Sequence, residues 1–330
     1  MSEGVIGVVV VMVAGVFNAA FALPMRYNRI WKWENTWLVF CAWSLGVFPW
    51  LLDGVLVKHL NELLASLSFR DVVPALLCGF LFGIAQAAFG VALRLVGVSI
   101  ALPVVSVLAI MVGAFTPVLV RHPGILLGRQ GLIMGLSMLF LVGGLILYWH
   151  AARLREGTSG SRRSFRGLSL AIFTGILGGT INVGFALSDE MVHRSRMLGN
   201  SASVSTYPVW AVLLAAAFVP NLIYCSYLIW RDHTGKLFMS ADTWADFARS
   251  TLMAVLWILA TTLYGMSTTF LGEFGASAGY LFYGCFTIFF ANVLGWKAGE
   301  WVGAPSPALR RFWAAMGLVL ASVVILGLTV

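Results

Sequence analysis

Long apolar runs, separated by short polar segments, follow one another along the whole chain. A helix needs about 20 apolar residues to cross the hydrocarbon core of a membrane, and each run has about that length. The pattern leaves almost no sequence for anything else. It predicts ten spanning helices, over residues 4–24, 35–57, 72–94, 97–120, 128–150, 168–189, 203–230, 250–271, 275–297 and 309–329.

The main polar interruption, residues 151–167, divides the chain into two halves of five spans each. It holds five arginines among Gly and Ser residues: Arg153, Arg155, Arg162, Arg163 and Arg166. Because each half has an odd number of spans, the second half enters the membrane in the opposite direction to the first. We therefore expect an all-α integral membrane protein of two inverted five-helix repeats, residues 1–150 and 168–330, joined by a cytoplasmic linker.

A nine-residue pattern occurs once in each half and supports this division. Residues 15–23 and 179–187 share Gly, Asn, Phe, Ala and Leu at the same five positions. Asn18 and Asn182 are the informative match, because an amide in an apolar run rarely faces lipid. Inverted repeats are the architecture of secondary transporters, which bind substrate where the halves meet, although a channel can share this symmetry. The alternative is that both asparagines only bond neighbouring helices.

Composition and charge agree with a membrane protein and give it an orientation. The chain is 60% hydrophobic and 10% charged, whereas a soluble domain carries about 25% charged residues. The net charge of +8 is not a nucleic-acid signal, because the basic residues lie at span ends and in short loops. Cytoplasmic loops are enriched in Lys and Arg, and the loops after even-numbered spans are the basic-poor side. The distribution therefore predicts that both termini lie outside a bacterial inner membrane. Among the 21 Lys and Arg residues, the basic-poor side holds only Lys58, Arg70, Arg121, Arg129, Arg194 and Arg196.

Polar and aromatic side chains within the spans are candidates for binding a substrate. An aromatic ring can pack on the apolar face of a sugar while amides and hydroxyls bond the sugar hydroxyls, as in pockets with apolar walls and few polar groups. For each residue the alternative is helix or lipid packing, and for Gln86 it is a bond between helices. The candidates are Asn18, Trp43, Gln86, Asn182, Trp210, Tyr264, Tyr280 and Tyr283.

A proton-coupled carrier needs a group that titrates, and acidic residues deep in the spans are scarce. Asp53 lies about a turn from the end of the second span, and Asp189 ends the sixth, one turn beyond Phe185. We expect Asp189 to be the proton-coupling residue; the alternative is a solvated helix end. No nucleotide-binding or metal-ligand motif occurs, so no cofactor is expected, and nothing indicates an oligomeric state.

Three groups of residues carry a resemblance to a known family. They are Trp31-Lys32-Trp33-Glu34-Asn35-Thr36-Trp37 with Pro49-Trp50; Gly79, Gly83, Gly90, Arg94, Gly97 and Ser99; and Tyr264-Gly265, Leu271-Gly272, Gly275-x-Ser277-x-Gly279, Asn292, Gly295 and Gly299-Glu300-Trp301. With these residues the chain resembles the L-rhamnose–proton symporters of the drug/metabolite transporter superfamily. Some members of that family carry an acidic residue early in the ninth span, where this chain has Gly279-Tyr280-Leu281-Phe282-Tyr283.

The resemblance implies uptake of L-rhamnose or a related 6-deoxyhexose by proton symport, with the sugar, protons and membrane lipid as partners and no nucleic acid. A carrier or exporter of another small metabolite, without proton coupling, is the alternative within the superfamily. A non-transporting sensor or scaffold is the alternative outside it. No signature of an enzyme is present.

Overall fold

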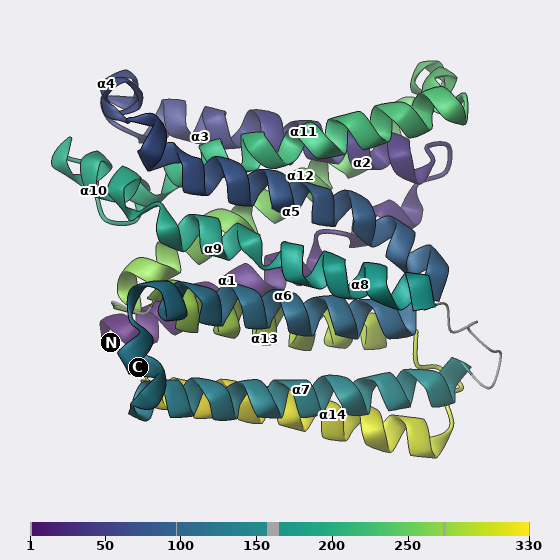
Figure 1. Ribbon diagram of the computed structural model, residues 1–330. Helices are drawn as coiled ribbons and strands as arrows, with labels where there is room; N and C mark the ends of the chain where they lie inside the picture. The colour runs from purple at the N-terminus through teal and green to yellow at the C-terminus, as the bar shows by residue number, and fades with distance from the viewer. Residues whose placement is uncertain (1, 97, 157–164, 273–274, 330) are drawn as a thin grey trace.

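The computed structural model describes residues 2–96, 98–156, 165–272 and 275–329, and Figure 1 shows them as a bundle of helices with both chain termini at one edge. Within these residues, 10 helical segments are long and apolar enough to cross a membrane. Each overlaps one of the predicted runs; the largest differences are in the sixth span, which ends at Met197 and not at 189, and in the eighth, which begins at Thr243 and not at 250. The ten-span, all-α prediction is therefore confirmed.

Several helices form each half of the chain. The first half comprises α1 (Glu3–Ala20), α2 (Trp33–Cys41), α3 (Phe48–Leu56), α4 (Leu60–Ser66), α5 (Phe69–Val96), α6 (Val98–Arg121) and α7 (Arg129–Glu156). The second comprises α8 (Phe165–Gly178), α9 (Thr180–Leu187), α10 (Asp189–Met197), α11 (Tyr207–Arg231), α12 (Thr243–Phe270), α13 (Gly275–Lys297) and α14 (Ser306–Leu326).

The second and sixth spans are interrupted helices. In the second, a π-helical turn, η2 (Ala42–Val47), joins α2 to α3. Pro49 follows this turn and has no N–H to donate to the carbonyl of Leu45, while Ser44 Oγ donates to the carbonyl of Phe40 at 2.7 Å. In the sixth, α8 meets α9 at the Gly178–Gly179 pair, and the polar helix α10 continues beyond Ser188.

The helices of the two halves alternate in the bundle. The first span, α1, packs against α12 and α13 of the second half, and the sixth span, α8 with α9, packs against α5 and α6 of the first. The second span packs against α11, which also lies along α5. The last spans of the halves, α7 and α14, pack against each other and form the outer layer at the bottom of Figure 1.

The repeated glycines sit at two of these contacts. A Cβ built on Gly15 of α1 would lie 2.5 Å from Phe286 Cβ of α13, and one built on Gly179 would lie 2.6 Å from the Ala109 carbonyl oxygen of α6. Because no real Cβ comes that close, only glycine lets these backbones approach. The nine-residue pattern therefore marks the contact of the first span with the ninth and of the sixth with the fourth.

The pair Gly79 and Gly83 brings α5 against α11. A Cβ on either would come within 3.0 Å of a backbone carbonyl oxygen, that of Leu213 or of Ala217. Small residues four apart allow this kind of close helix packing in membranes, so these two glycines account for the close approach of α5 and α11.

Candidate functional site

A cluster of aromatic rings lies where α9, α11, α12 and α13 meet. Tyr264 is at its centre, with ring centroids 5.1 Å from Tyr283, 5.7 Å from Tyr280 and 6.0 Å from Trp210. Trp210 stacks on Phe185 at 4.5 Å with an interplanar angle of 12°. The structure thus brings together four aromatic residues singled out in the sequence, and it adds Phe185. The sequence signal for Phe185 was its place in the nine-residue repeat.

Asn182 binds this cluster to the rest of the bundle and is fully buried. Its Nδ2 donates to the carbonyls of Gly113 at 2.8 Å and Ala276 at 2.9 Å, and its Oδ1 accepts from the Tyr264 hydroxyl. The same hydroxyl lies 2.9 Å from the Ala276 carbonyl oxygen. The Asn182 amide therefore joins α9 to α6, α12 and α13, and both its nitrogen and its oxygen are hydrogen-bonded within the protein.

Trp210 differs from Asn182 because its polar atom is unused. The side chain is buried, and the indole Nε1–H has no hydrogen-bond partner in the described part of the chain. Gly265 makes room for it, since a Cβ at that position would overlap the indole nitrogen and lie 3.2 Å from Thr206 Oγ1. A buried donor left unpaired costs about 1–3 kcal/mol, so this N–H is an unsatisfied donor within the aromatic cluster.

A cavity of about 600 Å³ adjoins the cluster on the side of α10. Its floor includes Phe185, Thr206, Thr268 and Ala276, and its exposed rim carries charged and polar side chains: Asp189, Glu190, His193 and Arg196. In Figure 1, α10 lies at the same edge of the bundle as the chain termini. The size is within the usual range of 300–1,000 Å³ for small-molecule pockets, and the lining offers both aromatic surface and polar groups.

A second cavity, of about 750 Å³, lies between α6, α7 and α8. Its walls are apolar except for Trp149. A polar ligand buried there would lose its hydrogen bonds to water without replacement, which is unfavourable. The cavity beside α10 is therefore the better candidate for a polar substrate.

Asn18 lies one turn beyond the aromatic cluster. Its Nδ2 donates to Thr287 Oγ1 of α13 at 3.2 Å, and Thr287 is four residues from Tyr283 on the same helix, so both share one face. Asn18 and Asn182 thus make matching contacts, the first to the ninth span and the second to the fourth and ninth. Both asparagines are directed into the bundle.

Gln86 and Trp43 do not join the cluster. Gln86 Oε1 accepts from Asn221 Nδ2 at 2.9 Å, and Asn221 Oδ1 accepts from Trp37 Nε1 at 3.1 Å. Asn221 was missed, although an amide inside an apolar run was the same signal that selected Asn18. Trp43 lies in the π-helical turn and stacks on Phe48 at 5.1 Å.

Asp189 stands at the rim of the cavity and is paired. Its carboxylate accepts from both terminal nitrogens of Arg121, with Nη2 at 2.6 Å from Oδ1, and 63% of its side chain is exposed. The pair connects the start of α10 to the end of α6. The coupling role predicted for Asp189 stays a prediction.

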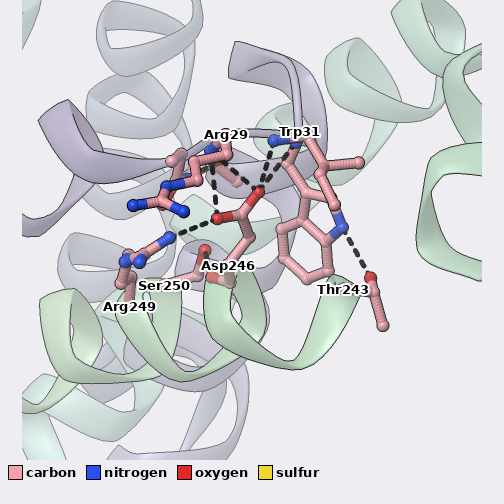
Figure 2. A network of polar contacts seen from close by, with 9 residues as sticks. Arg29, Trp31, Thr243, Asp246, Arg249 and Ser250 are labelled. Carbon is pink, nitrogen blue, oxygen red and sulfur yellow. Dashed lines mark hydrogen bonds and ion pairs between the residues drawn. The ribbon is translucent and has the colours of Figure 1, made fainter. Parts of the chain in front are cut away.

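A second acidic residue, which the sequence analysis did not single out, lies in the first turn of α12, at the other end of that helix from Tyr264. Asp246 is 1% exposed and accepts from the backbone N–H groups of Ile30 at 2.8 Å and Trp31 at 2.9 Å, and also from Arg29 N–H. Arg249 Nη1 completes the set at 2.7 Å. Figure 2 shows the carboxylate enclosed by these donors. Asp246 therefore connects the segment between the first two spans to the eighth span, α12, through hydrogen bonds.

Comparison with known proteins assigns the chain to a family. No curated protein matches it. The family model described as L-rhamnose-proton symport protein (RhaT) matches residues 1–328, nearly the whole length. The chain therefore belongs to the L-rhamnose–proton symport protein (RhaT) family, and it is a proton-coupled sugar transporter rather than an enzyme.

Proposed function

We propose that the protein takes up L-rhamnose or a related 6-deoxyhexose by alternating access between two inverted five-helix repeats, and that the cavity beside α10 is the sugar entrance. The repeats are residues 1–150 and 168–330, with residues 151–167 as the linker. We also propose that the chain belongs to the drug/metabolite transporter superfamily, as the sequence resemblance implies. Family membership supplies the proton-coupled sugar transport; the site, the repeats and the cycle are the proposal.

The unpaired indole N–H of Trp210 is the observation that carries the proposed site. It is buried, both it and Thr206 of the cavity lining lie next to Gly265, and Phe185, which also lines the cavity, stacks on the same ring. A 6-deoxyhexose offers hydroxyl oxygens that can accept from this N–H, and C–H groups and a methyl that can pack on the aromatic rings. Binding sugar would satisfy the donor that the empty site leaves unpaired.

The other predicted residues take different places in the proposed path. Asn182 and Tyr264 would fix the position of the residues at the cavity floor. Tyr280, Tyr283 and Asn18 would extend the sugar path along α13. Gln86 and Trp43 lie away from the cluster and would meet the sugar after the halves have moved. Buried amides and aromatic rings along one path fit a binding site with apolar walls and a few polar groups.

Two features support inverted halves. In Figure 1, α1 begins at the edge that holds the termini and α8 begins at the opposite edge, so the first and sixth spans run in opposite directions. Their contacts also exchange: α1 meets α13, and α8 with α9 meets α6. Substrate binding where two such repeats meet, followed by rocking of the repeats, is the usual cycle of this architecture.

The distribution of basic residues supports an orientation in a bacterial inner membrane. The arginine-rich linker would face the cytoplasm and both termini the periplasm. The cavity mouth at α10 is on the side of the termini, so it would open to the periplasm. In that orientation the structure corresponds to the state that receives sugar.

Uptake of labelled L-rhamnose into proteoliposomes tests the site. The variant Trp210→Phe keeps a stacking ring but removes the N–H, and the loss of one hydrogen bond should raise KM about two- to tenfold. Trp244→Phe, at an exposed tryptophan of α12, is the matched control and should leave KM unchanged. An unchanged KM in Trp210→Phe refutes the proposed site, and a wild type that transports no L-rhamnose refutes the substrate.

A further inference from the structure

Asp53 of α3 is a buried carboxylate with nothing to bond to. Its side chain is 0% exposed, and among the described residues both carboxylate oxygens lack a hydrogen-bond partner. The contrast with Asp246 is direct, since Asp246 is equally buried but accepts from three backbone N–H groups and an arginine. The fold therefore provides for a charged group at Asp246 and does not provide for one at Asp53.

The groups around Asp53 leave its charge uncompensated. The helix α3 packs against η2, α11 and α12. On α11, Tyr207 is the titratable residue that interacts electrostatically with Asp53; η2 has none, and α12 has only Tyr264 in its nearer half. Lys58 follows α3, but its side chain is exposed. An isolated buried carboxylate is strongly disfavoured, so Asp53 is held here as the neutral acid.

Asp53 lies close to the cavity without lining it. Its neighbour Tyr207 is half-buried and directly follows Thr206, which belongs to the cavity floor. The helices α3 and α4 lie at the same edge of the bundle as α10 in Figure 1. The carboxylate therefore interacts with the first residue of α11, next to a residue that lines the cavity.

We propose that Asp53 binds the proton that is transported with the sugar. The carboxylate takes up one proton while the cavity is open, as in this structure, and returns the same proton to water on the other side when the halves have moved. The neutral acid can be carried in an interior without partners, whereas the charged form cannot. This inference rests on the proposed alternating-access function.

Two other carboxyl groups are rivals that the test must separate. Asp189 is exposed at the rim and paired with Arg121. Glu34 is buried in the same span as Asp53 and its Oε1 also lacks a partner, but it lies in the first turn of α2, at the opposite end of the span.

Proteoliposomes carrying the full chain distinguish these assignments through two measurements. The first is accumulation of labelled L-rhamnose under an imposed gradient of about one pH unit, which can drive about tenfold accumulation with one proton per sugar. The second is counterflow between labelled and unlabelled sugar at equal pH on both sides, which needs no net proton movement. Asp53→Asn should lose the tenfold accumulation and keep counterflow, and the matched control Glu34→Gln should keep both.

The result that overturns the proposal is normal accumulation in Asp53→Asn, or loss of accumulation with retained counterflow in Asp189→Asn but not in Asp53→Asn. If Asp53→Asn is monodisperse but loses counterflow as well, Asp53 is needed for translocation itself and the proposal also fails. If that variant does not fold, Asp53→Glu decides, because it keeps a carboxyl group and must keep accumulation. Absence of counterflow in the wild type would instead refute the proposed sugar.

Discussion

Removing the Asp246 carboxylate should destabilise the protein more than any exposed acidic substitution. Asp246→Ala leaves the N–H groups of residues 29–31 and Arg249 without their acceptor. Each backbone N–H left unpaired costs about 1–3 kcal/mol. Water at the end of the helix can replace part of the bonding, so we expect about 1 kcal/mol for each of the three backbone N–H groups. The free energy of unfolding should therefore fall by about 3 kcal/mol.

Asp246→Asn should fall between this variant and the wild type. The amide oxygen can still accept from Ile30 and Trp31, which both donate to one carboxylate oxygen. The amide nitrogen, in contrast, would meet Arg249 and the Arg29 N–H, which are donors themselves. Losing the charge-assisted hydrogen bonds from Arg249 and from the Arg29 N–H should lower the free energy of unfolding by about 1.5–3 kcal/mol.

Unfolding in detergent, followed by tryptophan fluorescence during an SDS titration, measures these differences. Asp242→Asn is the control, because Asp242 is exposed and directly precedes α12, and it should shift the free energy of unfolding by less than about 0.5 kcal/mol. If Asp246→Ala unfolds like this control, the carboxylate does not stabilise the segment between the first two spans and the reasoning is refuted.

Three further substitutions have defined outcomes in the same unfolding assay. Gly79→Ala should cost about 1–3 kcal/mol, because its Cβ would overlap the Leu213 carbonyl oxygen, whereas Gly135→Ala has no atom within 4 Å and should be neutral or stabilising; equal effects would contradict this. Tyr264→Phe should cost about 1–3 kcal/mol, because Asn182 Oδ1 loses its donor, and an unchanged unfolding midpoint would refute that bond. Arg121→Gln should change stability by less than about 1 kcal/mol, since Asp189, its partner in the ion pair, is 63% exposed, and a larger loss would show a buried role.

The sequence was sufficient for the spans and for some of their contacts. Apolar runs located all ten helices, since length and hydropathy alone decide which segments can cross a membrane. The repeat containing Asn18 and Asn182 indicated residues directed inward. These features depend on local spacing along a single helix, which a sequence displays.

Partners from distant segments could not be predicted in this way. Asp246 lies in the first turn of a span, where an acidic residue usually meets water, and the chain does not reveal that residues 29–31 fold over it. In the sequence, both Asp53 and Asp189 lie near span ends, and Asp189 is the predicted proton-coupling residue. Only the tertiary structure separates the exposed carboxylate paired with Arg121 from the buried one without a partner.

The π-helical turn in the second span changes how that span must be aligned. Each residue of an α-helix advances the rotation by about 100°, and a π-turn accommodates one residue more than a regular turn. The phase of α3 therefore differs from that of α2, and no single helical wheel describes residues 33–56. Deleting one residue within 42–47 would make this turn regular and leave α2 and α3 in the same relative orientation, so Asp53 would stay in the interior, whereas a deletion between 48 and 52 would swing Asp53 around the helix axis by about 100°.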